Sequence, residues 1–428
     1  MMPIILYPTA TGKNTHLKSL SASGHVIPPN TLARLGTAIA LQKSGLVSIA
    51  IGHRFLRDEG VMALCSGLED SLVEELDLAW KDLSTDGMAA LGRTFGPSRS
   101  LRKLILSRNE RVKDEGIIAL CTSAFTQCKE LDRGAFSALQ ELDLSKCGIG
   151  STGVQSLAEL LKTSEDKLKV GGRSLSLSLS ANSLGDGACE SLATLLCDTL
   201  LLSSLSLANC GIGNEGIKLL SLAAASGACN SLKMLDLSYN GIGKEGAAAL
   251  GKSLWNDKAS GWPQLMDLCL AGNNLSASGV QNVMDALMWD DGNAKNKTLQ
   301  SLDLTQTSCG IDGAVAAVRC QSLSSLRLFN NKLGTEGFRA LAKLLQGGHA
   351  SLANLDLGGN DASQASVVEL LTALMKDGKG FISKLRLLEM GGNQGGYDVE
   401  EVIEKLKQVH PELDVARDRP RQSEGTSS

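Results

Sequence analysis

The sequence contains few aromatic residues and no long apolar run. Aromatic residues make up only 3% of the 428 positions, so the core must be built from aliphatic side chains. No apolar stretch reaches the roughly 18 residues that a membrane-spanning helix requires. The net charge of −4 argues against a general affinity for nucleic acid, and the hydrophobic content of 43% argues against wholesale disorder. These features predict a folded protein with neither a membrane nor a nucleic acid as its partner.

The cysteines and histidines lack the spacing that metal sites and catalytic sites require. None of the 11 cysteines lies in a C-x-x-C pair, and the five histidines fall at unrelated positions. Neither an H-E-x-x-H nor a G-x-S-x-G motif occurs. We therefore expect no catalytic activity, no metal and no cofactor. Residues 1–10 lack the basic flank and the long apolar segment of a secretory leader, so reduced thiols in the cytoplasm, or in the nucleus, are expected.

One pattern recurs along nearly the whole chain. Its clearest copy is L-x-x-L-x-L-x-x-N-x-I at residues 232–242, and the same frame returns at residues 323–333. The ninth position of the frame is Asn in seven units and Cys in two. Units begin at residues 17, 46, 73, 101, 139, 174, 202, 232, 265, 299, 323, 352 and 385, which gives thirteen units of about 31 residues.

The frame of each unit predicts a short strand followed by a helix. The Leu-x-Leu alternation places two side chains on one face of a strand, and leucines four residues apart, such as Leu157 and Leu161, form an apolar stripe on a helix. The ninth-position Asn is expected to bond backbone groups in the turn where the strand ends. A single unit cannot bury its apolar face, but stacked units can. The sequence therefore predicts an α/β solenoid.

The chain resembles leucine-rich repeat proteins of the ribonuclease-inhibitor-like class. The resemblance rests on the long unit, the I-G-N-E-G turn at 212–216 and the Asn/Cys exchange, and it covers about residues 17–413. It implies a horseshoe with a parallel β-sheet on the concave face and helices on the convex face. We expect residues 1–16 to be an N-terminal flank, 17–413 the repeat domain and 414–428 a disordered polar tail. The unit at 299 is short, so its helix is expected to have only a turn or two.

The third and fifth positions of the frame point away from the core, onto the concave face of the sheet. Acids occupy nine of these positions, and only Lys103 and Arg327 oppose them. Such a face would attract a protein partner with a basic surface. The alternative is that Asp between the two leucines merely belongs to the repeat consensus. The acids are Glu75, Asp77, Glu141, Asp143, Asp236, Asp267, Asp303, Asp356 and Glu389.

Three aromatic residues are assigned to the eighth position, at the rim where the strand gives way to the turn. They are Trp80, Tyr239 and Phe329. Exposed rings are typical anchors of protein interfaces, and the alternative is that they pack on a neighbouring turn. We expect the nine acids and these three rings to form the protein-binding surface of a monomer.

Residues 246–253 match the phosphate-loop pattern G-x-x-x-x-G-K-S. The Ala-Ala-Ala-Leu within this match favours a helix, and Leu250 is a core position of the repeat. We interpret the match as a coincidence and expect no bound nucleotide.

The leading hypothesis is a non-enzymatic scaffold or regulator that holds another protein on its concave face and rim. One alternative is a Ran-type small-GTPase activating protein, which shares this repeat class but usually ends in a long acidic segment that this chain lacks. Another alternative is a ribonuclease inhibitor, because ribonucleases are often basic. A third is a sensor similar to the repeat regions of nucleotide-binding immune receptors.

Overall fold

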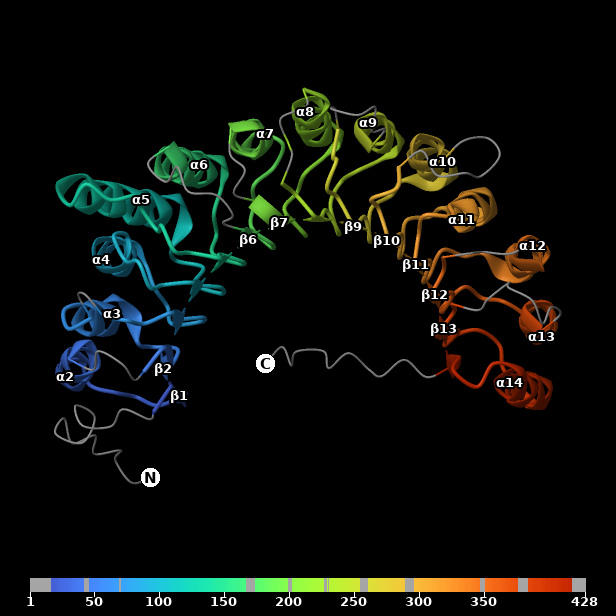
Figure 1. Cartoon of the computed structure of the whole chain (residues 1–428), viewed down its shortest axis with the longest axis horizontal. Coiled ribbons are helices and arrows are strands. Elements are labelled where there is room, and N and C mark those ends of the chain that lie inside the picture. The colour runs from blue at the N-terminus through green and yellow to red at the C-terminus, as the bar shows by residue number, and fades with distance from the viewer. Residues whose placement is uncertain are drawn as a thin grey trace. The chain divides into compact units, whose positions relative to one another are not determined.

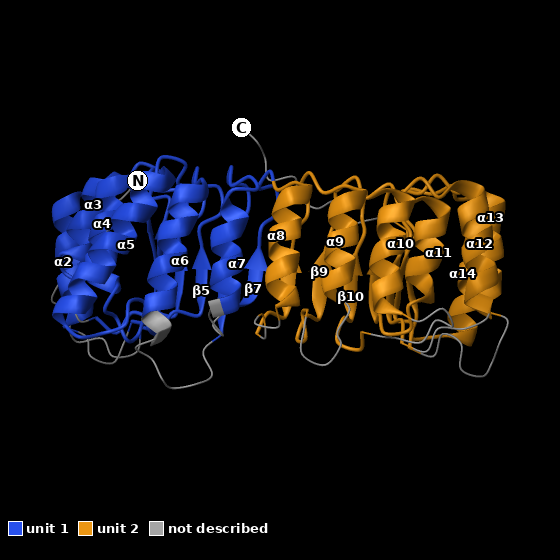
Figure 2. Ribbon diagram, turned by 90° about the horizontal axis from the view of Figure 1, so that it is seen from above, with its two compact units in different colours: residues 1–211 blue, residues 212–428 orange. Residues whose placement is uncertain are grey.

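A computed structural model gives the fold of the chain (Figure 1). Strands and helices alternate along it, and the chain divides into two compact units, Met1–Gly211 and Ile212–Ser428 (Figure 2). The structure describes residues 17–41, 46–68, 71–166, 174–198, 202–226, 229, 231–254, 261–288, 296–346, 351–375 and 384–417.

In its described part, the first unit contains seven strands and six helices. The strands are β1 (Ser19–Ser23), β2 (Ser48–Gly52), β3 (Glu75–Asp77), β4 (Lys103–Ile105), β5 (Glu141–Asp143), β6 (Leu175–Ser178) and β7 (Leu202–Ser206). The helices are α2 (Pro29–Ala40), α3 (Arg57–Cys65), α4 (Thr85–Phe95), α5 (Lys113–Glu130), α6 (Ser151–Asp166) and α7 (Ala188–Asp198).

The second unit repeats the same alternation, with seven strands and seven helices among its described residues. The strands are β8 (Met234–Asp236), β9 (Asp267–Cys269), β10 (Ser301–Asp303), β11 (Ser325–Arg327), β12 (Asn354–Asp356), β13 (Leu387–Glu389) and β14 (Asp414–Ala416). The helices are α8 (Asn214–Ala225), α9 (Lys244–Leu254), α10 (Ser276–Leu287), α11 (Gly310–Arg319), α12 (Gly334–Gln346), α13 (Gln364–Met375) and α14 (Tyr397–Val409).

Within each unit the strands pair in parallel and in chain order. In the first unit the pairing runs from β1 to β7, and in the second from β8 to β14. Equivalent frame positions lie opposite one another, as Leu76 does to Ile49 and Leu104. In each unit the strands line the concave side and the helices the convex side (Figure 1). The predicted leucine-rich repeat solenoid is confirmed.

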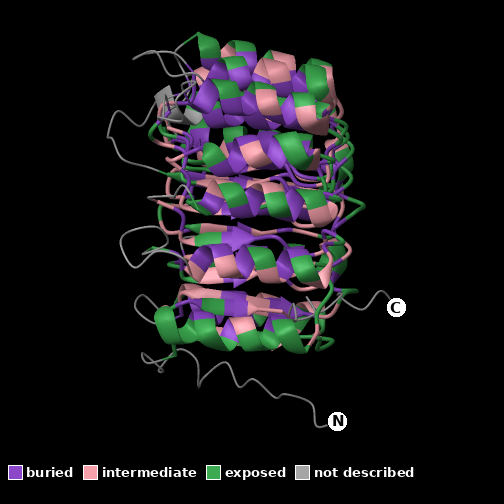
Figure 3. Ribbon diagram, turned by 90° about the vertical axis from the view of Figure 1, so that its right-hand side faces the viewer, coloured by how far each residue is buried: buried purple, intermediate pink, exposed green. Residues whose placement is uncertain are grey.

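The core lies between the strands and the helices and is almost entirely aliphatic. The strand leucines Leu76 and Leu78 are buried, and so is the helix leucine Leu91. The helices alternate buried and exposed positions, because only one side of each helix faces the sheet (Figure 3). Only Trp262 and two phenylalanines contribute rings to the largest fully buried side chains. The scarcity of aromatics in the sequence therefore corresponds to a core made mainly of leucine.

Two expectations about local structure were wrong. Helix α11 has 10 residues, nearly three turns rather than one or two, because alanines such as Ala317 favour a helix and are small enough to be buried in its contact face. The tail predicted to be disordered from residue 414 begins with β14, because pairing with β13 satisfies its backbone and Val415 is buried. The rest of that tail, 418–428, and the flank 1–16 lie outside the described residues.

Candidate functional site

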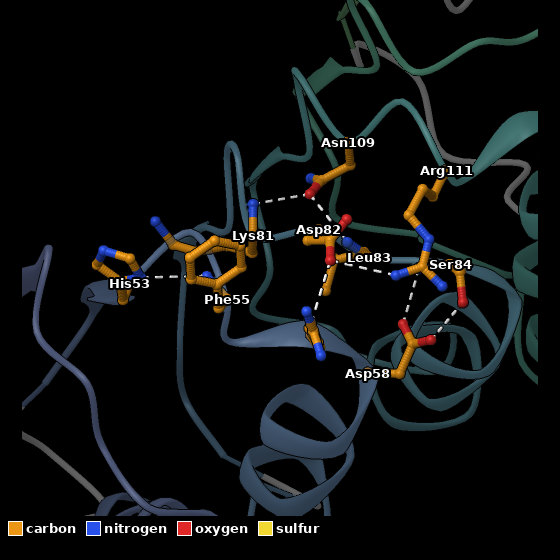
Figure 4. Close-up of polar contacts among 10 residues, drawn as sticks. His53, Phe55, Asp58, Lys81, Asp82, Leu83, Ser84, Asn109 and Arg111 are labelled. Carbon is orange, nitrogen blue, oxygen red and sulfur yellow. Dashed lines mark hydrogen bonds and ion pairs between the residues drawn. The ribbon is translucent and has the colours of Figure 1, made fainter.

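Ninth-position asparagines connect each repeat to the one before it. The Oδ1 atom of the fully buried Asn109 accepts the backbone N–H groups of Lys81 at 2.8 Å and Leu83 at 3.2 Å (Figure 4). Its Nδ2 atom donates to the carbonyls of Leu78 at 3.0 Å and Leu106 at 2.7 Å. The same four-bond arrangement recurs at Asn182, Asn273 and Asn393. This network fixes the turns that follow the strands.

Cysteine replaces this asparagine in two units and reproduces part of the network. The Sγ atom of Cys147 donates to the Leu106 carbonyl at 3.1 Å, and Cys210 donates to the Leu179 carbonyl at 3.2 Å. Burial raises the pKa of the Cys147 thiol to about 12, so it remains protonated and able to donate at neutral pH. The Asn/Cys exchange thus has a structural explanation.

Lys81 is the ninth-position residue of its repeat, a placement that we had not predicted from the sequence. Its side chain takes the place of the asparagine and is only 7% exposed. Burial lowers the pKa of Lys81, and the neighbouring Asp77 carboxylate opposes that shift. The signal was present in the sequence, because the ninth position is Asn or Cys in nine of the thirteen units and a lysine there departs from the frame.

The fifth-position aspartates on the concave face have a role in the fold. Asp77 Oδ1 accepts the N–H of Ala79 at 2.9 Å. The flanking N–H groups of Leu78 and Trp80 pair with carbonyls of the next repeat, so the N–H of Ala79 points away from that repeat. The carboxylate supplies the missing acceptor where the strand ends. The equivalent bond is made by Asp143, Asp236, Asp303 and Asp356.

In the first unit, four acids and one base line the concave face. Glu75 is exposed, whereas Asp77, Glu141 and Asp143 are half-buried. Lys103 Nζ forms an ion pair with Glu141 at 2.8 Å. The hydrogen bond to Glu141 raises the pKa of Lys103, and the charges of Glu75 and Asp77 raise it further. These acids lie on β3 and β5, on either side of β4, which carries Lys103.

In the second unit, the fifth positions form a row across adjacent strands. Asp236 and Asp303 flank Cys269 in this row, and Arg327 Nη1 forms an ion pair with Asp303 at 3.5 Å. The pKa of the Cys269 thiol is raised to about 12, first by burial and then by the charges of Asp303 and Asp236. Asp267 is exposed on the third position. The fifth positions from β8 to β11 are therefore Asp236, Cys269, Asp303 and Arg327.

Asp356 departs from the expected exposure. Its side chain is only 3% exposed, and its Oδ1 accepts the N–H of Gly358 at 2.9 Å. The ring of Phe329 covers the same glycine, since a Cβ on Gly358 would lie 2.9 Å from the Phe329 ring. Asp356 is therefore part of the turn and is not accessible to a partner. Glu389 in the next repeat remains half-buried.

The aromatic residues differ in their placement. Trp80 and Tyr239 occupy the rim with side chains 54% and 55% exposed and with φ of +58° and +54°. The assignment of Phe329 to the rim was wrong, because it is the seventh residue of its frame and Asn330 takes the rim conformation, with φ +53°. The Phe329 ring packs on the neighbouring turn, where a Cβ on Gly359 would lie 2.9 Å away.

The phosphate-loop pattern lies in a regular helix. Residues 246–253 fall inside α9, so their backbone N–H groups do not form a loop that curves around an anion. The Ser253 hydroxyl is buried, donates to the Leu250 carbonyl at 2.8 Å and accepts the indole N–H of Trp262 at 3.0 Å. The serine has a structural role in helix packing.

The described ranges hold neither a metal-binding cluster nor a membrane-spanning helix. Those residues contain no cluster of three or more His, Cys, Asp or Glu side chains that could hold a metal ion. No helix among them is both long enough and apolar enough to cross a bilayer.

Comparison with known proteins agrees with the repeat. Residues 98–121, 138–158, 201–221, 228–251 and 319–342 match the family model described as Leucine Rich repeat. The chain is 28% identical to the ribonuclease inhibitor of Mus musculus over 395 residues, covering 85% of this chain and 80% of the inhibitor. It is 27% identical to the Sus scrofa ribonuclease inhibitor over 403 residues, covering 87% and 83% respectively.

A second group of relatives contains the repeats as one part of a longer protein. The chain is 27% identical to human NACHT, LRR and PYD domains-containing protein 5, covering 88% of this chain but 29% of that protein. Among solved structures, an internalin from Listeria monocytogenes is 12% identical, covers 97% of this chain and 89% of its own, and has a TM-score of 0.46. The chain contains leucine-rich repeats and is similar to ribonuclease inhibitors.

Proposed function

We propose that this protein is a non-enzymatic scaffold or regulator that binds a partner with a basic surface on its concave face. The observation that carries the proposal is the state of the fifth-position carboxylates. Oδ1 of Asp77 and of Asp143 is held by a backbone N–H, and no described residue donates to their Oδ2 atoms. Each carboxylate is thus fixed in place with an oxygen available to a cationic group.

The geometry favours binding over catalysis. The acids lie on paired strands, so their backbone is ordered before a partner arrives and the entropic cost of association is small. Lys103 pairs with Glu141 and Arg327 pairs with Asp303, and neither base forms an ion pair with Asp77 or Asp143. The eleven cysteines are thiols rather than disulfides, which supports action in a reducing compartment such as the cytoplasm or nucleus.

Ribonuclease inhibition is the specific form of this function that the comparisons favour. The similarity to two ribonuclease inhibitors extends over at least 80% of their length. A basic ribonuclease also has the charge that the acidic faces of both units would attract. No observation among the described residues favours the GTPase-activating alternative.

The test separates the charge of the acids from their role in the fold. Asp77→Asn combined with Asp143→Asn removes two charges but keeps an Oδ1 acceptor for each backbone N–H. The matched control is Glu115→Gln with Glu159→Gln, which removes two charges from exposed positions on helices α5 and α6. Binding and inhibition of a basic ribonuclease are measured by titration calorimetry and by residual RNA cleavage.

We expect the concave variant to bind about tenfold more weakly than the natural protein, with a larger difference at low salt. The helix control should retain the natural affinity. Equal affinity of all three proteins would show that the concave face of the first unit is not the binding surface. Binding without loss of RNA cleavage would retain the scaffold and exclude the inhibitor.

A further inference from the structure

The turns after β2, β3 and β4 form a surface opposite in charge to the concave face. We call it the arginine–aromatic rim, and it consists of Arg54, Phe55, Arg57, Trp80, Arg108 and Arg111. All six side chains are exposed. They come from three consecutive repeats of the first unit, whose strands are paired side by side.

Two exposed rings form cation–π contacts with the guanidinium groups of Arg54 and Arg57. The Arg54 guanidinium carbon lies 4.7 Å from the Phe55 ring centroid and 5.4 Å from the Trp80 ring centroid. The Arg57 guanidinium carbon lies 5.5 Å from the Phe55 centroid. A cation–π contact forms no hydrogen bond with the guanidinium, so its N–H groups can still bind a carboxylate. Both rings remain 54% exposed.

A single carboxylate orients two of the arginines. Asp82 Oδ2 accepts Arg57 Nε and Arg111 Nη1, each at 3.2 Å (Figure 4). The Arg57 and Arg111 side chains nevertheless remain 61% and 58% exposed. Within the described residues, no carboxylate lies in ion-pair distance of Arg54 or Arg108. The rim therefore presents four guanidinium groups against one carboxylate.

The other acids near these turns already have partners. Asp58 accepts both the backbone N–H and the hydroxyl of Ser84 (Figure 4). Glu110 forms an ion pair with Lys146 at 3.4 Å. Neither carboxylate contacts the four guanidinium groups, so the positive charge of the rim is not compensated there.

We propose that the arginine–aromatic rim binds an acidic peptide segment. Carboxylates of the segment pair with the in-plane N–H groups of Arg54 and Arg108, and an apolar side chain lies against the Phe55 and Trp80 rings. A nucleic acid fits less well, because the acids of β3 lie on the adjoining strand and repel a continuous polyanion. This proposal does not depend on concave-face binding, with which it shares only Trp80.

The test uses the full chain and a fluorescein-labelled peptide of alternating Glu and Leu, with binding followed by fluorescence anisotropy. The rim variant is Arg54→Glu with Arg108→Glu, a change that breaks no ion pair among the described residues. Its matched control is Arg93→Glu with Arg99→Glu, which reverses two exposed charges elsewhere in the same unit. Circular dichroism melting verifies that each variant is folded, and Arg54→Gln with Arg108→Gln replaces the rim variant if it is not.

The rim variant should bind the peptide at least about tenfold more weakly, whereas the control changes by less than about twofold. Added salt should weaken binding to the natural protein. Trp80→Asn, which suits the positive φ at this position, should reduce affinity for the Glu–Leu peptide more than for a Glu–Gly peptide. The concave variant, Asp77→Asn with Asp143→Asn, should not weaken binding of the peptide.

Three outcomes would overturn the proposal. The first is an affinity that the rim variant does not alter. The second is equal binding of a Lys–Leu peptide, which would show that charge does not select the segment. The third is tighter binding of a labelled oligothymidylate through Arg54 and Arg108, which would make the rim a nucleic-acid site. Because the ribonuclease assay uses other residues, failure here leaves the concave-face proposal standing.

Discussion

Replacing Asn109 by Ala should be one of the most destabilising single changes in the first unit. The substitution leaves two N–H groups and the Leu78 carbonyl without their partner in a fully buried site, while the Leu106 carbonyl keeps the Cys147 thiol as a donor. An unsatisfied buried group costs about 1–3 kcal/mol, and relaxation of the turn recovers part of the combined loss. We expect the free energy of unfolding to fall by about 4 kcal/mol. Asn109→Cys should lose about half as much free energy of unfolding, because Cys147 shows that a thiol at the ninth position still donates to a carbonyl of the preceding repeat.

Urea unfolding followed by circular dichroism measures this loss. Native-state hydrogen exchange locates it, because a repeat array can open in one region before the rest. The amides of Lys81 and Leu83 should lose protection selectively. Asn282→Ala, at an exposed position of α10, is the matched control and should leave stability nearly unchanged. A loss below about 1 kcal/mol in Asn109→Ala, or unchanged protection of the two amides, would refute the role assigned to the network.

Three further changes test other parts of the structure. Asp303→Asn should lower the pKa of Cys269 and speed its alkylation in alkaline solution. The substitution removes one of the charges that raise this pKa but keeps the acceptor for the Thr305 N–H. An unchanged pH profile of iodoacetamide labelling would contradict this. Lys81→Met should stabilise the protein near neutral pH, and this gain should shrink as pH rises toward 10.5. The reason is that the folded natural protein binds fewer protons at Lys81 than the unfolded protein does in that window. A difference between the urea midpoints of the two proteins that does not change with pH would contradict this. Gly92→Ala should destabilise by about 2 kcal/mol in thermal melts, since its Cβ would collide with the Leu120 carbonyl of the next helix. Gly187→Ala should have little effect, because its Cβ would make only an ordinary van der Waals contact, 3.7 Å from Ser151 Cβ.

The sequence predicted the repeat because the same physical constraint returns in every unit. A leucine at the fourth or sixth position must be buried whichever repeat it belongs to, so Leu76 and Leu104 carry the same signal. The ninth-position Asn was interpretable for the same reason, since the turn always leaves N–H groups that need an acceptor. The concave placement of Glu75 and Asp77 followed directly from strand alternation.

Contacts between side chains of different repeats were not predictable in this way. The Phe329 ring packs on Gly358 and Gly359 of the next repeat, whereas counting the frame one residue off had assigned this ring to the rim. The arginine–aromatic rim was not predicted because Asp82 binds Arg57 and Arg111, which lie 25 and 29 residues away in the sequence. A usable signal existed, since Arg54 and Lys81 replace the expected asparagine in neighbouring units and thereby mark these turns as unusual.

The asparagine network gives the solenoid a direction. Asn109 accepts N–H groups from the turn of the preceding repeat, so that turn is complete only when the following repeat is in place. Removing repeats from the carboxyl end would expose unsatisfied amides at each new terminus, whereas removing them from the amino end would free an asparagine side chain that water can solvate. The ribosome releases the repeats from the amino end first. Each new repeat therefore supplies the asparagine acceptor that the turn of the preceding repeat needs.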